Sequence, residues 1–195
     1  MSKHIINCSP LKKNSNKKKF SILVLGGSQG AEIFGTIIPT VVKMIKDAGY
    51  EIEINQQCVT SQKNSIIDFY KKNNIKNYVF EFDKDISKFI LSSNLAITRC
   101  GASTTAELAH TLTPFIAVPL ANSIDNHQYL NAKYYENKGC CWLLEQDNFN
   151  TENLFNLIIE TIKNKNKLEN IRENMKKSYN KNVYSNIENE IKEYI

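Results

Sequence analysis

Three glycines stand between a short apolar run and a helical pattern, and this arrangement could bind a phosphate. Residues 21–25 form the apolar run, Gly26, Gly27 and Gly30 follow it, and apolar residues at helical spacing begin at Ala31. Such a turn leaves backbone N–H groups and the positive end of a helix dipole directed at one point, which suits an anion. Any tight strand-to-helix turn of an α/β protein has a similar pattern, so the glycines by themselves leave both interpretations open.

A dinucleotide site is the obvious alternative for this glycine turn. The spacing is GGxxG, whereas the dinucleotide fingerprint is GxGxxG. The second predicted strand ends in Asn55, Gln56 and Gln57, without the acid that would hold a ribose there. Glu51 and Glu53 lie too early, at the start of that strand. The pattern therefore argues against a nucleotide-dependent oxidoreductase.

A second glycine-containing stretch, TRCGASTTAEL at residues 98–108, again follows an apolar run and opens a helical pattern. Its Glu107 has two interpretations. Thr104 and Glu107 have the S/T-x-x-E spacing of a capping box, in which the carboxylate reaches back to the first residue of the helix. The same carboxylate could accept two hydroxyls of a ribose. Taken alone, the spacing favours the cap, because this motif is common at helix starts.

A third stretch, VPLANSIDNHQYLNA at residues 118–132, places amides at the start of another helical pattern. Gln128 and Asn131 could bind a sugar, because an amide both donates to and accepts from hydroxyl groups. The alternative is a helix capped by Asp125 with an ordinary polar face. His127 by itself is more typical of an exposed surface histidine than of a catalytic one.

Alternating strand and helix patterns must position these three stretches. Strands are predicted near residues 21–25, 51–56, 78–80, 95–98, 115–118 and 140–144. Helices are predicted near residues 31–47, 62–73, 85–91, 104–111 and 126–137, with two or three more in residues 151–194. The alternation predicts an α/β, Rossmann-like domain with a doubly wound parallel sheet of about six strands and a helical C-terminal tail. Ligands bind beyond the carboxyl ends of the strands in such folds.

Composition narrows the class of protein. The chain has 195 residues, of which 42% are hydrophobic, so it can bury one good-sized core and is not a disordered chain. No apolar run approaches the roughly 20 residues that span a bilayer, and residues 1–19 lack the apolar segment of a signal peptide. These features predict a cytoplasmic protein. Its cysteines are odd in number and irregularly spaced, which predicts reduced packing thiols: Cys8, Cys58, Cys100, Cys140 and Cys141. The histidines are too scattered for a metal cluster, so no metal is expected.

The net charge of +5 comes from the start of the chain. Residues 1–20 hold six lysines and no acid, which leaves 19 basic and 20 acidic residues elsewhere. This segment could touch anionic lipid or nucleic acid, but a solvated linker is the commoner meaning of such a run. We therefore expect a basic linker at 1–19, a ligand-binding domain at 20–195 whose residues 145–195 are mainly helical, and no nucleic-acid partner.

Together the three stretches resemble the carboxyl-terminal half of the MurG-type enzymes of glycosyltransferase family 28. GGSQGA, RCGASTTAELA and VPLANSIDNHQYLNA occur in that order, and the resemblance covers roughly residues 20–145, with the tail similar in pattern only. It implies one half of a GT-B fold and an inverting N-acetylglucosaminyltransferase. That enzyme moves N-acetylglucosamine from UDP-N-acetylglucosamine to lipid I, forming lipid II in peptidoglycan synthesis.

The resemblance also implies roles for individual residues, without a metal or another cofactor. The diphosphate would lie against Gly27, Ser28, Gln29, Gly30, Gly101, Ala102 and Ser103. The uracil would contact the backbone of Phe82 and Asp83, and the ribose would be held by Glu107, which reverses the preference for a cap. The N-acetylglucosamine would contact His127, Gln128 and Asn131.

The sequence departs from the family in several places. The GNPVR or GNPIR motif, whose Arg contacts the uracil, is missing, Cys100 replaces Ser or Ala, and Asn126 stands where Asp is common. The amino-terminal domain, which carries the acceptor loops, the base and the membrane patch, is also missing. The resemblance therefore implies donor binding with little turnover, unless an amino-terminal partner supplies the lipid I site at the inner face of the membrane. A non-catalytic module that binds nucleotide sugars or another protein is the alternative.

Overall fold

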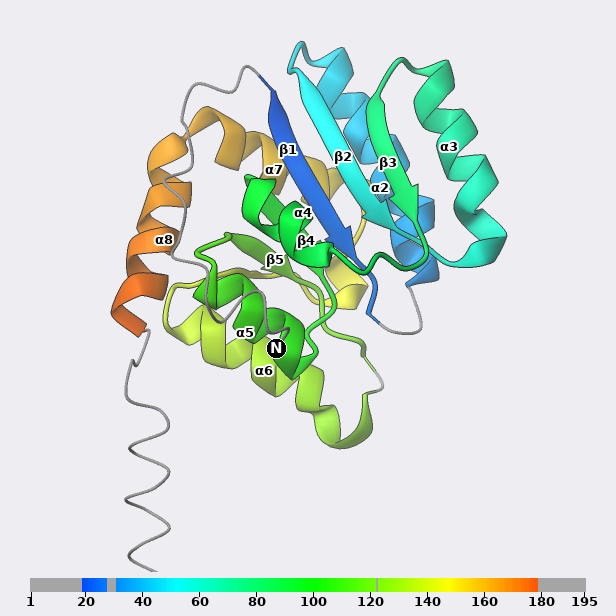
Figure 1. Ribbon diagram of the computed structural model, residues 1–195. Helices are drawn as coiled ribbons and strands as arrows, with labels where there is room; N and C mark the ends of the chain where they lie inside the picture. Colours follow the sequence, from blue (N-terminus) through cyan, green and yellow to red (C-terminus); the bar gives the residue numbers. More distant parts are fainter. Residues whose placement is uncertain (1–18, 28–30, 122, 179–195) are drawn as a thin grey trace, which may run out of the picture.

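The computed structural model describes residues 19–27, 31–121 and 123–178, and a parallel sheet runs through the middle of them (Figure 1). Six strands pair in the order β3-β2-β1-β4-β5-β6. Their bounds are β1 (Phe20–Leu25), β2 (Ile52–Gln57), β3 (Lys76–Phe80), β4 (Leu95–Thr98), β5 (Phe115–Ala117) and β6 (Trp142–Leu143). The strand order reverses between β1 and β4, which is where ligands bind in doubly wound folds. The predicted fold class is confirmed.

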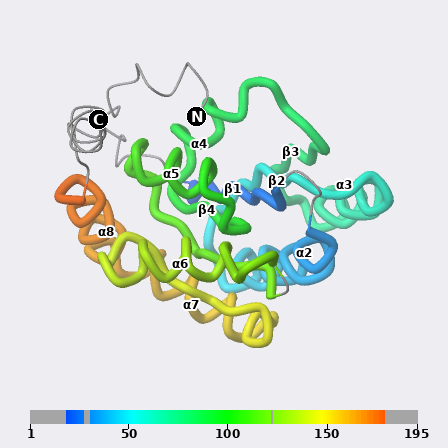
Figure 2. Tube along the Cα trace, turned by 90° about the horizontal axis from the view of Figure 1, so that it is seen from below, coloured from blue at the N-terminus to red at the C-terminus, as the bar shows by residue number. Residues whose placement is uncertain are grey.

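Helices cover both faces of the sheet (Figure 2). They are α2 (Glu32–Asp47), α3 (Lys63–Lys72), α4 (Ile86–Ser92), α5 (Ala102–His110), α6 (His127–Asn137), α7 (Thr151–Lys163) and α8 (Lys165–Ser178). Helices α2, α3 and α7 pack on one face, in the core that contains Phe34, Tyr70 and Ile158. Helices α4, α5, α6 and α8 pack on the other, in the core that contains Leu108 and Met175. No helix in the described part of the chain is long and apolar enough to cross a bilayer.

Strand β1 is apolar from Ile22 to Leu25 and is buried on both faces. Ile22 and Val24 belong to one core, and Leu23 and Leu25 to the other. A strand with helices on both faces buries successive side chains on opposite sides, which favours a near-continuous apolar run. Strand β2 alternates instead, with buried residues between half-buried ones, because α2 and α3 cover only one of its faces. This difference leaves the last residue of β2, Gln57, half-buried.

The structure corrects two predicted helix starts. Helix α5 begins at Ala102, with Gly101 as its N-cap, so Thr104 lies inside the helix and the predicted capping box is wrong. Helix α6 begins at His127 after a short 3-10 turn at Ile124–Asn126, and the Ser123 hydroxyl accepts from the Gln128 N–H in its first turn, so the alternative of an Asp125 cap is wrong as well. In both places the helix begins at another residue than the capping motif indicates.

The remaining predictions hold in outline. The strand predicted at 78–80 begins at Lys76, the one at 115–118 ends at Ala117, and the one at 140–144 reduces to two residues. Two helices, α7 and α8, account for the tail as far as residue 178. The thiols of Cys58, Cys100, Cys140 and Cys141 are buried and unpaired, in agreement with packing roles. Residues 1–18, with Cys8 and most of the basic linker, and residues 179–195 lie outside the described residues.

Candidate functional site

A pocket opens at the carboxyl ends of β1, β4 and β5, with a volume of about 910 Å³. Its walls come from two strand-to-helix connections and from the loop after β5. We call the described residues Gly26, Gly27 and Ala31, between β1 and α2, the first turn, and residues 99–101, between β4 and α5, the second turn. Because β1 and β4 are neighbours, the two turns face the same crevice. All three predicted motifs therefore contribute to one site.

The first turn contains a glycine in the left-handed conformation, and a side chain from β2 holds its start. Gly27 has φ of +82°, a conformation that a side chain would strain, and it lines the pocket. The backbone N–H of Gly26 donates to Oε1 of Gln57 over 3.0 Å. Ala31 precedes α2 without a side-chain cap. Of the predicted phosphate residues in this turn, Gly27 is described, whereas Ser28, Gln29 and Gly30 lie outside the described residues.

The second turn leads directly into α5. Gly101 is the N-cap in an extended conformation, and no side chain caps the helix. Gly101, Ala102 and Ser103, all predicted to face phosphate and sugar, line the pocket. An uncapped helix start has backbone N–H groups without helical partners, and its dipole attracts negative charge. This wall of the pocket is therefore suited to an anion.

Two predicted sugar-binding amides instead hold the second turn in place. Oε1 of Gln128 accepts from the backbone N–H groups of Cys100 and Leu120, each over 3.1 Å. Nδ2 of Asn131 donates to the carbonyl of Cys100 over 3.0 Å. Gln128 also lines the pocket, whereas Asn131 does not. Both side chains thus shape the site, and their contact with a sugar stays a prediction.

His127 stands at the mouth of the pocket. Its ring is exposed, and Nδ1 lies 2.6 Å from the carbonyl oxygen of Ile124, with which it forms a hydrogen bond. The side chain of Ile124 is 80% exposed beside it. This end of the site is open to a larger ligand or to another protein surface.

Glu107, Phe82 and Asp83 do not line the pocket itself. Glu107 is half-buried in α5, beyond the uncapped turn. Phe82 and Asp83 follow β3, and the Phe82 ring is 77% exposed. The Asp83 carboxylate accepts from the Tyr78 hydroxyl and the Asp85 N–H over 3.0 and 2.8 Å. The Asp85 N–H bond leads the contacts that lower the pKa of Asp83, so this carboxylate is charged at neutral pH.

The structure also brings in Arg99, to which the sequence analysis assigned no role. Its guanidinium is buried and lines the pocket, with the side chain only 8% exposed. It donates to the carbonyls of Val118 and Pro119 over 3.2 and 3.0 Å, and to Oε1 of Gln146 over 2.8 Å. It also lies 5.1 Å from the centre of the Phe34 ring. Arg99 therefore ties together the second turn, the loop after β5 and helix α2.

Arg99 is unusual because its buried guanidinium donates its hydrogen bonds to neutral groups. Its charged end contacts carbonyl and amide oxygens, and none of the ion pairs found among the described residues includes it. Burial lowers the pKa of the guanidinium, but an arginine stays charged at neutral pH. A buried charge without a counter-charge is costly, so an anion in the pocket would stabilise it. The signal in the sequence was an arginine directly after a buried strand.

No group of three or more His, Cys, Asp or Glu side chains in the described part of the chain comes together in a way that could hold a metal ion. Arg99 and the uncapped helix starts of the two turns place positive charge at the pocket, and Glu32 at the start of α2 places a carboxylate on its lining.

Comparison with known proteins agrees with this geometry. The family model described as the glycosyltransferase family 28 C-terminal domain matches residues 21–190. A relative from Rickettsia prowazekii, named UDP-N-acetylglucosamine--N-acetylmuramyl-(pentapeptide) pyrophosphoryl-undecaprenol N-acetylglucosamine transferase, is 39% identical over 162 residues, which are 82% of this chain and 42% of the relative. A relative of the same name from Pelagibacter ubique is 38% identical over 153 residues, 78% of this chain and 42% of its own.

Solved structures give the same fold. The crystal structure of Acinetobacter baumannii MurG superimposes with a TM-score of 0.79 and 25% identity, covering 93% of this chain and 52% of that one. The chain thus spans about half the length of the relatives it matches, and its sheet and helices correspond to one half of that structure. Since the family model matches nearly the whole described domain, the chain belongs to glycosyltransferase family 28, in which it corresponds to the C-terminal domain.

Proposed function

We propose that residues 20–195 form the donor-binding domain of a MurG-type N-acetylglucosaminyltransferase and bind UDP-N-acetylglucosamine in the pocket between the two turns. The observation that carries the proposal is the buried, unpaired charge of Arg99 beside an uncapped helix start. A diphosphate supplies two negative charges at that position, and backbone N–H groups can accommodate its oxygens. The names of the relatives support the choice of nucleotide sugar.

The roles of the remaining residues follow from the same proposal. Glu107 would hold the ribose hydroxyls, Phe82 and Asp83 would contact the uracil, and His127 would contact the N-acetylglucosamine. The helix dipoles and Arg99 would stabilise the UDP leaving group, which needs no bound metal.

The complete reaction needs more than this chain. The matched part makes up 42% of the Rickettsia prowazekii relative, and in a GT-B enzyme the reaction takes place in the cleft between two domains. We propose that transfer to lipid I, which forms lipid II in peptidoglycan synthesis, requires an amino-terminal acceptor domain, at the cytoplasmic face of the membrane. Without it the chain binds donor with little turnover, because holding the acceptor beside the donor supplies much of the rate.

Calorimetric titration of the purified chain tests donor binding. UDP-N-acetylglucosamine is titrated first, with UDP-glucose and NAD as controls. Selective binding that is lost in Glu107→Ala and kept in Glu152→Ala, a control at an exposed position of α7, supports the proposal. Failure of the unchanged chain to bind UDP-N-acetylglucosamine contradicts it.

A non-catalytic nucleotide-sugar module is the second candidate, and the half-length match favours keeping it. The two functions differ once an acceptor domain is present. The amino-terminal half of the Rickettsia prowazekii relative, which lies outside the match, is mixed with this chain. Transfer of labelled N-acetylglucosamine to lipid I is then measured. Transfer that needs both components supports a split enzyme. Donor binding without transfer, in a mixture that forms a complex, supports the non-catalytic module.

A further inference from the structure

Gln57 joins two parts of the candidate site that are distant along the chain. It is the last residue of β2, between β1 and β3 in the sheet. Its Oε1 accepts from the N–H of Gly26 over 3.0 Å, and its Nε2 donates to the carbonyl of Glu81 over 3.1 Å. Gly26 lines the pocket, and Glu81 directly precedes Phe82. One amide thus bridges the first turn and the start of the segment after β3.

Both ends of this amide are engaged with backbone. Dinucleotide-binding folds place an acid at the end of the second strand, where it holds the ribose. The Gln57 amide has a different task, since an oxygen that accepts and a nitrogen that donates are both required between an N–H and a carbonyl. A carboxylate could still accept from Gly26, but it could not donate to Glu81. The need for an amide therefore comes from its position between a donor and an acceptor.

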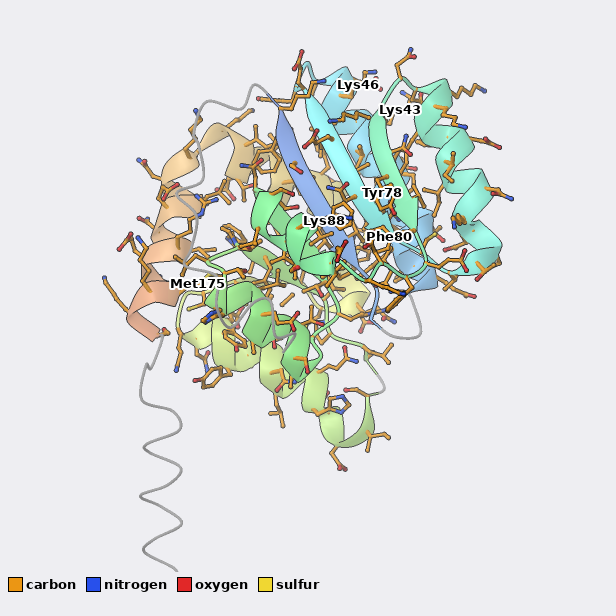
Figure 3. The ribbon with its side chains drawn as sticks, in the orientation of Figure 1. Lys43, Lys46, Tyr78, Phe80, Lys88 and Met175 are labelled. Carbon is orange, nitrogen blue, oxygen red and sulfur yellow. The ribbon has the colours of Figure 1, made fainter. Side chains whose placement is uncertain are left out.

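The segment after β3, residues 81–83, also has side-chain contacts that do not involve Gln57. The Glu81 carboxylate pairs with Lys63 over 3.0 Å and also accepts from the Thr60 hydroxyl. The Asp83 carboxylate accepts from Tyr78, and Lys88 lies 3.7 Å from it. Figure 3 shows Tyr78 and Phe80 along β3, with Lys88 beside them.

Stacked aromatic rings support the same segment. The ring of Phe89 in α4 stacks on Tyr78 and Phe80, with centres 5.2 and 5.6 Å apart. These contacts anchor the segment to β3, α3 and α4, whereas Gln57 anchors it to the first turn. Gln57 is therefore the side chain that links the backbone just before Phe82 to Gly26 at the pocket.

We propose that Gln57 is a positioning residue that sets the spacing between the first turn and the segment of Phe82 and Asp83, and that it thereby contributes to selectivity for uridine nucleotides. This inference rests on the proposed function, in which the first turn faces the diphosphate and that segment faces the base. With the correct spacing, one nucleotide contacts the first turn through its diphosphate and the segment after β3 through its base. With a wrong spacing, the diphosphate still binds but the base is recognised less well.

The test compares Gln57→Glu with Asn55→Asp. Asn55 lies two residues earlier on the same face of β2, is half-buried, and undergoes the same change from amide to carboxylate. Affinities for UDP and ADP are measured by calorimetry, and ADP serves as a diphosphate with the wrong base. Thermal unfolding of each variant checks that it is folded. Gln57→Met, which keeps the length of the side chain without hydrogen bonds, is a second variant in case the buried charge prevents folding.

We expect the preference of the chain for UDP over ADP to fall about tenfold in the Gln57 variants, because one to two hydrogen bonds are lost. The same preference stays unchanged in Asn55→Asp. A purely structural role would weaken binding of both nucleotides equally, so an unchanged ratio in a folded Gln57 variant overturns the inference alone. Failure of the unchanged chain to bind UDP overturns the proposed function, and this inference with it.

Discussion

The first and second turns have the same plan, but they are held in different ways. Each leads from a buried strand to a helix without a side-chain cap, and the two strands are neighbours. The first turn relies on the left-handed conformation of Gly27 and on one amide from the adjacent strand. The second turn has ordinary backbone angles at Gly101 and is held by Gln128 and Asn131 from α6.

This difference shows two ways of building an anion site. In the first turn a glycine permits the left-handed backbone, and one amide of the adjacent strand holds the start of the turn. In the second turn the shape is imposed by side chains about 30 residues later in the sequence, and a buried arginine provides the charge. We therefore expect the largest effects from the side chains that charge and support the second turn, and a greater sensitivity to backbone strain in the first turn.

Replacement of Arg99 tests this expectation most strongly. We expect Arg99→Met to weaken UDP binding by about 2–3 kcal/mol, or roughly 30- to 150-fold, because the pocket loses its buried charge. Calorimetry measures the affinity. Arg172→Met, in α8 and remote from the pocket, is the matched control. Equal affinities in the two variants would show that the charge of Arg99 does not act on the ligand.

Removal of the Gln128 amide tests the support of the second turn. In Gln128→Met the N–H groups of Cys100 and Leu120 lose their acceptor, so we expect the free energy of unfolding to fall by about 2 kcal/mol. Gln128→Glu keeps an acceptor oxygen and should recover most of that stability, but its negative charge should weaken UDP binding. Urea unfolding and calorimetry separate the two effects. A fully stable Gln128→Met would mean that the turn does not need this amide.

Alkaline pH also distinguishes the turns, because the second contains Cys100. Burial raises the pKa of this thiol to about 12, so the native chain keeps its proton where the unfolded chain loses it. The contribution of this thiol to stability is therefore full below its unfolded pKa, about 8.5, and falls by about 1.4 kcal/mol for each pH unit between there and the folded pKa of about 12. Urea unfolding at pH 8 and pH 10 measures this loss. Cys100→Ala lacks this thiol, so its free energy of unfolding should fall less between pH 8 and pH 10 than that of the unchanged chain. An equal loss in the two proteins would contradict the prediction.

The smallest expected effect compares one substitution in both turns. Gly27→Ser places a side chain at φ of +82°, and this backbone strain should lower the free energy of unfolding by about 1 kcal/mol. No steric clash adds to this cost, since the nearest atom, Cβ of Arg99, lies at an ordinary contact distance of 3.9 Å. Gly101→Ser should change stability by less than about 0.5 kcal/mol, since Gly101 has open space around it and serine is a good N-cap. Urea unfolding measures both, and equal costs would remove the proposed difference between the turns.

Much of the fold could be predicted because it depends on local patterns. The apolar run of β1 and the amphipathic helix α2 follow from the spacing of their residues, and alternation of such elements implies a parallel sheet. Helix starts were less predictable. The sequence around Thr104 has the capping spacing, but the helix begins two residues earlier, at Ala102, where Gly101 serves as the cap. The motif records which residues are compatible with a cap, and the packing of the turn decides where the helix begins.

The sequence by itself determined the doubly wound fold, the three stretches that meet at one edge of the sheet, and the family to which the chain belongs. Those features depend on periodicity and on short motifs. Only the tertiary structure decided that Arg99 is buried without a counter-charge and that Gln57 bridges two loops. Such roles depend on which backbone groups the fold places in contact with a side chain, and those groups come from distant parts of the sequence. No local pattern of residues specifies these contacts.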